Sequence, residues 1–358
     1  MKAALFSMGS VSSQRIVDAM EVYFEEVDHY DIRKIEMRIG KGETSLLYNG
    51  VDMKKQYDCV YLKSSFRYAL VQRALATYFL GHAYMPTSDP SAFTVVNDKV
   101  FTHLALEKEL IPTPETYITP TVGAAKKLLS EINFPIILKI PGGTHGKGVM
   151  FAESIATASG ILDTLEGLKQ SVLLQEYIET EGTDIRAIVV GDEVVAAMVR
   201  KANKDEKRSN LHAGGAAEAI SLDQKSKQIA VKAAKALNCE ICGIDILESV
   251  RGPLVLEANL SPGLQGIMEA TKVNIPDKIA KYLFKKTQEF KNINVTTDSA
   301  EDIIDEVNGA SENQIISHLD FRGERILLSK IVSKMSGFQP DEEVVVKVKN
   351  GKVTIEKS

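Results

Sequence analysis

Three oxygen-bearing side chains between residues 243 and 266 have the types and spacing of a magnesium site. Asp245 is flanked by two isoleucines, and Glu257 follows a Leu-Val-Leu run, with Asn259 two residues further along. Strand side chains alternate between faces, so Glu257 and Asn259 point the same way, and Asp245 reaches that face if the two apolar runs form a hairpin. Two carboxylates and an amide oxygen are hard ligands that suit Mg²⁺. A solvated acidic face is the alternative, but the apolar neighbours of each acid favour the metal site.

A glycine-rich segment follows a short apolar strand that contains Lys139. The strand is predicted at 136–140, and residues 141–148 read PGGTHGKG. Glycines let a backbone approach a polyphosphate, and free N–H groups there form an anion nest. The segment is not a P-loop, because Pro141 and Gly148 stand where that motif needs Gly and Ser or Thr. A flexible hairpin loop is the alternative, but a lysine in an apolar strand indicates an anionic partner.

Residues of the kinds that bind a nucleoside follow a later strand. Residues 175–178 read Gln-Glu-Tyr-Ile at the end of an apolar run, and Asp184 follows a Gly-Thr turn. An adenine needs an amide or backbone edge and an apolar wall, and a ribose needs a carboxylate. Without further context, surface acids are the alternative for these residues.

Basic residues form another group with the chemistry of an anion site. Arg186, Arg200 and the run Arg208-Ser209-Asn210 supply cations and amide donors, which suit carboxylates and transferring phosphoryl groups. Cross-strand pairing of Arg186 and Arg200 with surface acids is the alternative. No Ser/His/Asp or Cys/His arrangement stands out, which suits a reaction performed by positioning and electrostatics, as phosphoryl transfer is.

The composition is that of a soluble globular protein of two or three domains. The 358 residues are 44% hydrophobic and 25% charged, and the net charge of -5 makes nucleic acid an unlikely main partner. We expect no signal peptide and no membrane span. Three cysteines make no disulfide framework, which predicts a cytoplasmic protein. Cys239 and Cys242 have C-x-x-C spacing at the start of an apolar strand, where we expect buried thiols.

Strand and helix signals alternate at the beginning of the chain, which predicts a small α/β domain up to about residue 89. No G-x-G-x-x-G follows its first strand, so a dinucleotide site has no support there. The predicted strands are 2–8, 58–62, 136–140, 173–178, 185–190, 193–199, 241–247 and 254–259. The predicted helices are 12–24, 68–80, 97–110, 123–132 and 223–237.

The last part of the chain changes character at residues 291–312. Five acids lie between Asp298 and Glu306 with no base among them, which predicts an acidic linker with at most one short helix. Strand-like runs at 343–349 and 352–357 then flank Asn350-Gly351, the pair typical of a type I′ hairpin turn. A hairpin of this size is not stable alone, so we expect a homo-oligomer in which a second copy completes it.

Together these residues resemble the ATP-grasp superfamily, and within it the RimK-like α-L-glutamate ligases. The resemblance covers about residues 97–274, roughly half of the chain. Its motifs are N-D-K (97–99), I-L-K-I-P-G-G-T-H-G-K-G-V (137–149), Q-E-Y-I (175–178), D-I-R (184–186), R-S-N-L-H (208–212), G-I-D-I-L (243–247) and G-P-L-V-L-E-A-N-L-S-P-G-L-Q-G-I (252–267).

The resemblance implies an α/β, ATP-grasp fold with four parts. An N-terminal α/β pre-ATP-grasp domain would span 1–92, and an ATP-grasp domain of two α+β subdomains would span 93–290. The acidic linker, 291–312, would lead to a small β-rich domain at 313–358. The S-K-x-V-S-K-x-S-G-F-Q-P-D-E-E-V pattern of that tail resembles AbrB-type swapped-hairpin domains, which often dimerise and some of which bind DNA. Eight Lys/Arg against seven Asp/Glu from 311 to 358 favour dimerisation.

The resemblance also implies roles for the candidate residues, with ATP and two Mg²⁺ ions as cofactors and Mn²⁺ as an alternative ion. Asp245, Glu257 and Asn259 would bind the metal, and Arg186, Arg200 and Asn210 would act on the acyl phosphate and its precursors. Lys99 and Lys139 would hold the phosphates under the glycine loop, Glu176 and Tyr177 with Ile178 would read adenine, and Asp184 would hold the ribose. The full nucleotide set is Lys99, Lys139, Gly143, Gly146, Gly148, Gln175, Glu176, Tyr177, Ile178, Asp184, Arg208, Ser209 and Asn210.

The function implied is a carboxylate–amine ligase that forms an amide through an acyl phosphate, adding L-glutamate to an acceptor small molecule or protein tail. An amino-acid-biosynthesis or coenzyme-tailoring ligase is an alternative with the same chemistry. An ATP-sensing regulator with a dimerising or DNA-binding tail is an alternative of another class. Ala213 stands where family members often have Arg, which leaves the choice of donor and acceptor open.

Overall fold

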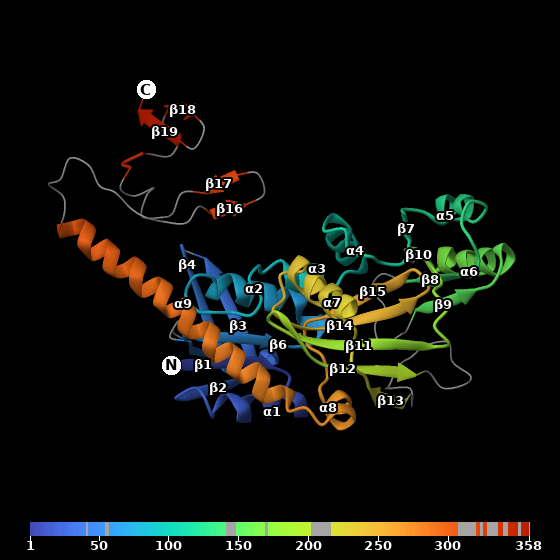
Figure 1. Cartoon of the computed structure of the whole chain (residues 1–358), viewed down its shortest axis with the longest axis horizontal. Helices are drawn as coiled ribbons and strands as arrows, with labels where there is room; N and C mark the ends of the chain where they lie inside the picture. Colours follow the sequence, from blue (N-terminus) through green and yellow to red (C-terminus); the bar gives the residue numbers. More distant parts are fainter. Residues whose placement is uncertain are drawn as a thin grey trace. The chain divides into compact units, whose positions relative to one another are not determined.

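The computed structural model describes residues 1–40, 42–53, 57–140, 148–168, 171–201, 216–306, 320–322, 325–327, 336–338, 343–349 and 352–357 (Figure 1). The chain divides into two compact units, Met1–Thr287 and Gln288–Ser358. The first unit contains the two sheets expected of an ATP-grasp domain and the α/β domain that precedes them.

A parallel sheet of order β2-β1-β6 forms the centre of the N-terminal domain. Its strands are β1 (Lys2–Ser7), β2 (Glu26–Asp31) and β6 (Cys59–Lys63), and its helices are α1 (Val11–Met20) and α2 (Ala69–Phe79). Every residue of β6 is buried, as expected for a parallel strand that is covered on both faces. The predicted strands and helices here are confirmed, although α1 ends at Met20 rather than at residue 24.

A second, antiparallel sheet of this domain was not predicted. It consists of β3 (Ile35–Gly40), β4 (Glu43–Tyr48) and β5 (Val51–Asp52), and short helical turns occur at η1 (Ile32–Lys34), η2 (Phe66–Tyr68) and α3 (Ala92–Val95). Most of its residues are at least partly exposed, so its sequence lacks the apolar run by which the buried strands were recognised.

The first ATP-grasp subdomain is an antiparallel sheet of order β7-β10-β8-β9 covered by two helices. Its elements are α4 (Lys99–Lys108), β7 (Thr116–Thr119), α5 (Val122–Leu128), β8 (Ile136–Lys139), β9 (Val149–Ala152), α6 (Ile155–Gly167) and β10 (Val172–Glu176). The Asp98 side chain caps α4 by accepting hydrogen bonds from the backbone N–H groups of Val100 and Phe101. Lys99 is therefore fixed in the first turn of α4.

The second subdomain is a five-stranded antiparallel sheet of order β13-β12-β11-β14-β15. Its elements are β11 (Thr183–Val190), β12 (Glu193–Lys201), β13 (Ala216–Ala219), α7 (Gln224–Ala236), β14 (Ile241–Ser249), β15 (Gly252–Asn259) and α8 (Gln265–Thr271). Both predicted hairpins, β11–β12 and β14–β15, are confirmed.

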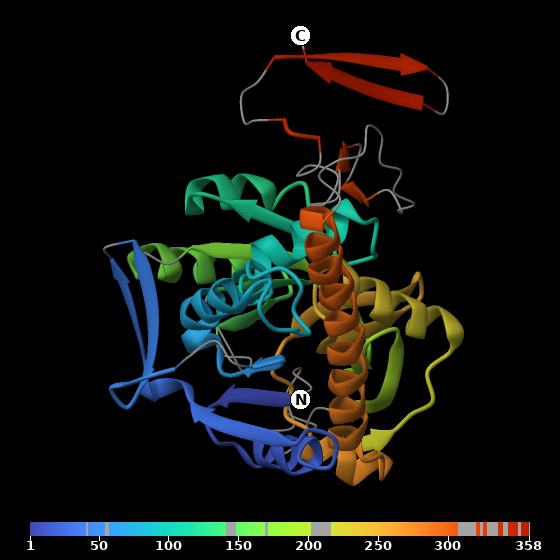
Figure 2. The ribbon, with the colours of Figure 1, turned by 90° about the vertical axis from the view of Figure 1, so that its left-hand side faces the viewer.

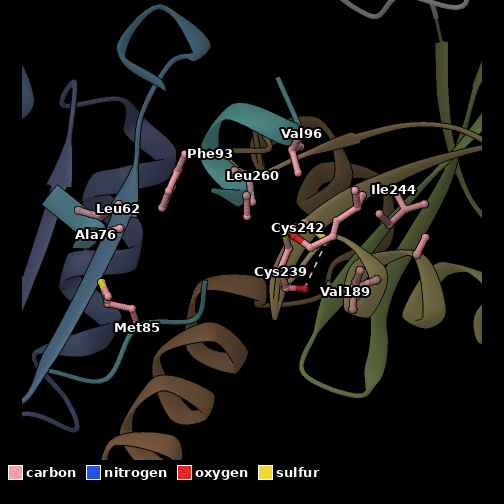
Figure 3. Packing of buried hydrophobic residues seen from close by; sticks show 14 of the residues in the cluster. Leu62, Ala76, Met85, Phe93, Val96, Val189, Cys239, Cys242, Ile244 and Leu260 are labelled. Carbon is pink, nitrogen blue, oxygen red and sulfur yellow. Dashed lines mark hydrogen bonds between the residues drawn. The ribbon is translucent and has the colours of Figure 1, made fainter. Parts of the chain in front are cut away.

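One apolar core joins the N-terminal sheet to the five-stranded sheet (Figure 3). Leu62 and Met85 lie on the N-terminal side of this core, and Val189 and Ile244 lie on the other side. Cys239 and Cys242 are buried free thiols in the same core, which confirms the prediction that they are structural. Burial raises the pKa of the Cys242 thiol to about 12, so it is neither a redox nucleophile nor a ready metal ligand.

The last long helix, α9 (Ile275–Glu306), runs through the segment predicted to be a linker. The expectation of at most a short helix was wrong up to residue 306, because no glycine or proline interrupts the helix after Pro276. The beginning of the helix lies beside the N-terminal domain (Figure 2). There Phe284 contacts the rings of Tyr23 and Phe24, which follow α1, and Tyr23 donates a hydrogen bond to Asp277.

Beyond α9, the described residues form two short hairpins. They are β16 (Asp320–Arg322) with β17 (Arg325–Leu327), and β18 (Val344–Lys349) with β19 (Lys352–Lys357). The second hairpin confirms the predicted strands, while the Asn350-Gly351 turn lies outside the described residues. None of the described helices is both long and apolar enough to cross a membrane.

Gly191, in the turn between β11 and β12, allows a test of how α9 is seated on the larger unit. Its φ is +64°, and a Cβ there would overlap the Tyr282 ring of α9. Gly50 is a matched control, because its φ is +79° and a Cβ there would meet nothing within 4 Å. We expect Gly50→Ala to cost about 1 kcal/mol from backbone strain alone, and Gly191→Ala about 2–4 kcal/mol, in urea unfolding. An equal loss of unfolding free energy in the two variants would show that α9 shifts at this contact without a measurable cost.

Candidate functional site

The three predicted metal ligands come together on the β14–β15 hairpin. Asp245 is paired with Glu257 across the two strands, and Gly243 is paired with Asn259. Paired residues of an antiparallel ladder project to the same face, so the side chains of Asp245, Glu257 and Asn259 share one face, as predicted. A register shift between Asp245 and Ile246 marks a β-bulge directly beside the acids.

Asp245 is a buried acid held between two arginines from neighbouring strands. Arg186 binds it in a bidentate manner, with Nε 2.8 Å from Oδ1 and Nη2 2.7 Å from Oδ2. Arg200 adds a third hydrogen bond, with Nη2 2.7 Å from Oδ2. Burial would raise the pKa of Asp245, but the charges of the two arginines outweigh it and hold this pKa well below its usual range. Asp245 is therefore ionised near neutral pH.

Asp184 extends this network by one more ion pair. It lies opposite Arg200 in the β11–β12 ladder, and its two carboxylate oxygens accept hydrogen bonds from Nε and Nη2 of Arg200. Both side chains are buried. The alternative for Arg186 and Arg200 was pairing with surface acids of neighbouring strands. The two arginines do pair with acids across the strands, but these acids are buried. A ribose role for Asp184 would require its carboxylate to leave Arg200.

Glu257 is the acid that this network does not balance. Two arginines match the charges of Asp184 and Asp245, and Glu257 then adds one further negative charge. Its residue is solvent-accessible, yet its carboxylate is crowded by protein atoms. Desolvation and the neighbouring Asp245 carboxylate raise the pKa of Glu257, whereas Lys139 and Arg186 oppose the rise. A cation placed between Glu257 and Asp245 would relieve this repulsion.

Lys139 is the residue of the first subdomain that lies near the acids of the β14–β15 hairpin. Its ammonium donates a hydrogen bond of 2.5 Å to Oε1 of Gln175 on the neighbouring strand, and it interacts electrostatically with Glu257 and with Lys99. Burial lowers the pKa of Lys139 to about 8, with a further contribution from Lys99, while Glu257 partly offsets both. Two lysines therefore approach one another beside the acids, which favours an anion between them.

The side-chain amide of Gln175 is engaged by three protein groups. Its oxygen accepts a hydrogen bond from Lys139, and its nitrogen donates to Thr116 Oγ1 at 2.8 Å and to His103 Nε2 at 3.1 Å. Gln175 is itself 2% exposed. These contacts hold Lys139 in place, and a role of Gln175 in nucleotide binding stays a prediction.

His103, one turn after Lys99 in α4, is a site residue that sequence analysis missed. Because Gln175 donates to Nε2, the proton of the neutral ring lies on Nδ1, which is buried and has no partner among the described residues. Burial, Lys139 and Lys99 lower the pKa of His103 to about 4, so the ring is neutral near pH 7. A lone histidine on an amphipathic helix gives no sequence signal of this kind.

The predicted adenine residues after β10 form an apolar wall and a link between subdomains. The rings of Tyr177 and Phe151 pack edge to face, with centroids 4.9 Å apart, and Ile178 is half-buried. The Glu176 carboxylate is not free, because Arg251 of the β14–β15 turn binds both of its oxygens at 2.6 Å. A polar cavity of about 200 Å³ lies beside β10 and is lined by Glu115, Tyr117, Glu131, Ile132, Asn133, Ile136, Gln175 and Glu176.

Several predicted residues lie outside the described part of the chain. They are Gly143, Gly146, Arg208, Ser209 and Asn210. Gly148 is described, with φ of +78°, and its carbonyl accepts a hydrogen bond of 3.0 Å from the Ile140 backbone N–H. This bond fixes the two ends of the glycine-rich loop against each other.

The donor set fits the groups that the sequence analysis expects. Within the described ranges, no three His, Cys, Asp or Glu side chains surround a common point, so a metal here would depend on two carboxylates and the Asn259 amide oxygen. Those are ligands typical of Mg²⁺, and the raised pKa of Glu257 indicates an acid short of a cation. Lys99, Lys139 and the unpartnered Nδ1–H of His103 are donors that fit a polyphosphate.

Comparison with known proteins identifies the family. A model of the RimK-like ATP-grasp domain matches residues 96–283. The probable alpha-L-glutamate ligase 2 of Hahella chejuensis is 35% identical over 291 residues, which cover 80% of this chain and 96% of that relative. The ribosomal protein bS6–L-glutamate ligase of Escherichia coli O81 is 34% identical over 287 residues, which cover 79% of this chain and 95% of that relative.

A solved structure shows that the fold is shared as well. The ATP-grasp ligase PsnB, complexed with minimal precursor, Mg and ADP, is 20% identical and matches with a TM-score of 0.61 over 80% of this chain and 98% of its own. The four-stranded and five-stranded sheets of the first unit are thus the two subdomains of an ATP-grasp fold. By both sequence and fold, the chain belongs to the RimK-like ATP-grasp family.

Proposed function

We propose that this protein is an ATP- and Mg²⁺-dependent carboxylate–amine ligase that adds L-glutamate to the carboxyl group of a protein or peptide acceptor. The observation that carries the proposal is the meeting of Lys139 and Lys99 with the acids Glu257 and Asp245, backed by the partly buried Arg186 and the buried Arg200. An arrangement of this kind suits phosphoryl transfer to a carboxylate, which depends on positioning and electrostatics.

The reaction has two steps that balance without a further reactant. An oxygen of the acceptor carboxylate forms a bond to the γ-phosphorus of ATP while the bond to ADP breaks. The amine of L-glutamate then forms a bond to the acyl carbon, phosphate leaves, and the amine loses a proton. Mg²⁺, when bound, would neutralise the charge of the phosphates, and we assign two such ions to Asp245, Glu257 and Asn259.

The roles of the remaining residues follow from their contacts. Lys99, Lys139 and His103 would bind phosphate oxygens, and Gln175 would hold Lys139 in place. Arg186 is tied to Asp245 but has one terminal nitrogen outside that pair, which could meet the acyl phosphate. Arg200 lies deeper, with Asp184 and Asp245, and would act by holding Asp245 ionised.

The names of relatives support a polypeptide acceptor. One relative is named a ribosomal protein bS6–L-glutamate ligase, and a structure of PsnB contains a precursor peptide. The experiment that tests the proposal is ADP release, with product masses, over a panel of amino acids and of peptides with different carboxyl termini. ADP release that requires both an amino acid and an acceptor would support a ligase. ATP binding without such turnover would favour the ATP-sensing regulator.

Glu257→Gln tests the metal assignment with little change of shape. The substitution removes the charge that no arginine balances, so we expect turnover to fall roughly 10²–10³-fold while the melting temperature is kept. Glu248→Gln is the control, because Glu248 is an exposed acid on the same hairpin. Near-full turnover of Glu257→Gln at ordinary magnesium would show that the metal site lies elsewhere.

Lys139 should make nucleotide affinity depend on pH. Its pKa is lowered to about 8, so the free protein loses this positive charge as the pH rises through that value. We expect calorimetric affinity for ATP with Mg²⁺ to fall about tenfold between about pH 7 and pH 9. Lys139→Arg keeps its charge and should bind with a flat profile. An equal decline of ATP affinity in the wild type and in Lys139→Arg would show that the titration of Lys139 is not the cause.

The tail is proposed to assemble copies of the chain rather than to take part in the chemistry. Val344, Val346 and Val348 lie on one face of β18 and are 38–76% exposed, and Val353 beside them is 55% exposed. A chain that ends near Glu289 should therefore keep ADP release but form a smaller oligomer by light scattering. An unchanged mass would refute the assembly role, and a folded but inactive truncation would show that the tail helps to build the site.

A further inference from the structure

The carboxyl edge of the N-terminal parallel sheet carries polar residues that the ligase chemistry above does not use. Ser7, Asp31 and Lys63 are the last residues of β1, β2 and β6, and they are register partners in this sheet. In open α/β sheets, the carboxyl ends of parallel strands are where ligands bind. This edge is therefore a place to look for a substrate site.

Lys63 is the unusual member of this group. Its residue is 5% exposed, and its side chain forms no ion pair or hydrogen bond with any described residue. Burial lowers the pKa of Lys63 to about 8, and no neighbouring charge contributes. Arg200 is also buried, but two carboxylates balance it. Desolvating an ammonium that has no paired acid costs free energy, which an anionic ligand beside Lys63 would offset.

The neighbours of Lys63 on this edge are polar and are themselves engaged. The Ser7 hydroxyl lies 2.7 Å from His29 Nε2 and accepts a hydrogen bond of 2.9 Å from the Gly9 backbone N–H. Asp31 is paired with Arg33, and burial lowers the pKa of His29, so neither compensates Lys63. No acid contacts the lysine among these groups.

This edge adjoins the loop that follows the metal-site hairpin. The Leu264 backbone N–H donates a hydrogen bond of 3.0 Å to the Ser12 hydroxyl at the start of α1. In that loop, the Ser261 backbone N–H donates to Asn259 at 2.8 Å, while the Ser261 hydroxyl is buried without a partner in the described structure. Tyr61, on the same face of β6 as Lys63, interacts electrostatically with Cys242 of β14.

We propose that Lys63 binds a non-reacting carboxylate of the amino-acid substrate, at the junction of the N-terminal sheet edge with residues 259–264. The proposal rests on the proposed ligase function. It places the carboxylate-bearing substrate at the loop that follows Asn259, whereas Lys99 and Lys139 belong to the first subdomain. The Ser261 hydroxyl is a second donor to the same ligand.

A carboxylate fits this position better than a phosphate. One ammonium balances one carboxylate charge, whereas a phosphate calls for several donors or a forked guanidinium. Lys99 and Lys139 already supply two cations at the proposed nucleotide site. L-glutamate carries two carboxylates besides its reacting amine, so it retains one for Lys63 whichever way it is oriented.

The test uses the full chain with Mg²⁺ and AMPPNP, and calorimetric titration with L-glutamate and with glutarate. We expect Lys63→Met to weaken L-glutamate binding at least tenfold, Lys63→Arg to retain most of it, and AMPPNP affinity to stay within twofold in both. Lys127→Met, at an exposed lysine of α5, is the matched control and should change neither. Because it removes an unpaired buried charge, Lys63→Met should also raise the melting temperature by about 2–4 °C.

The outcomes separate this proposal from the ligase function. Unchanged L-glutamate affinity in Lys63→Met, or binding of neither carboxylate by the wild type while AMPPNP still binds, would overturn the Lys63 site. A lowered melting temperature in Lys63→Met together with lost AMPPNP binding would also overturn it, because it would make Lys63 a structural residue. Carboxylate binding that depends on Lys63 without ADP release from any substrate pair would keep the site and refute the ligase.

Discussion

The ion pairs between Asp245 and the two arginines are the constraint on which the rest of the site depends. Three adjacent strands, β11, β12 and β14, bring Arg186, Arg200 and Asp245 together, and of these Arg200 and Asp245 are buried. Removing one member would leave an uncompensated buried charge, at a cost of roughly 3–5 kcal/mol. The register of these strands is thus fixed by charge as well as by apolar packing, and Glu257, paired directly with Asp245, takes its position from the same register.

The two subdomains meet through polar contacts at the C-terminal end of β10. Gln175 holds Lys139, which interacts electrostatically with Glu257 of the other sheet. The next residue, Glu176, is bound by Arg251 from the turn of the metal-site hairpin. Arg251 is more than half exposed, so this second contact is a weak one that can break without a large cost. The buried contacts set the geometry of the site, and the exposed contact permits the subdomains to adjust.

The sequence predicted the buried strands well and the polar contacts poorly, for one physical reason. An apolar run or an alternating pattern follows from local burial, so β6, β11, β12, β14 and β15 were recognisable, as was the common face of Asp245, Glu257 and Asn259. The partners of Gln175 depend on which strands become neighbours in space, and no local pattern contains that information. The β3–β5 sheet was not predicted, because its largely exposed strands lack such a run. The length of α9 was underestimated, because its acidic composition is typical of a linker, although no glycine or proline interrupts it.

The contacts of the Gln175 amide allow only one orientation of its oxygen and nitrogen, and this orientation fixes which neighbouring groups act as hydrogen-bond donors. Its oxygen is committed to an ammonium and its nitrogen to two acceptors, so turning the amide over would set donor against donor at Lys139 and acceptor against acceptor at Thr116. The amide orientation also determines the tautomer of His103. Because Nε2 accepts a hydrogen bond from Gln175, the ring proton lies on Nδ1, which has no partner in the described structure. An uncharged N–H donor at that point selects ligands by their acceptor lone pairs rather than by their net charge. It can bind an oxygen atom of a ligand, but it cannot form a hydrogen bond with an ammonium or a guanidinium group, which are themselves only donors.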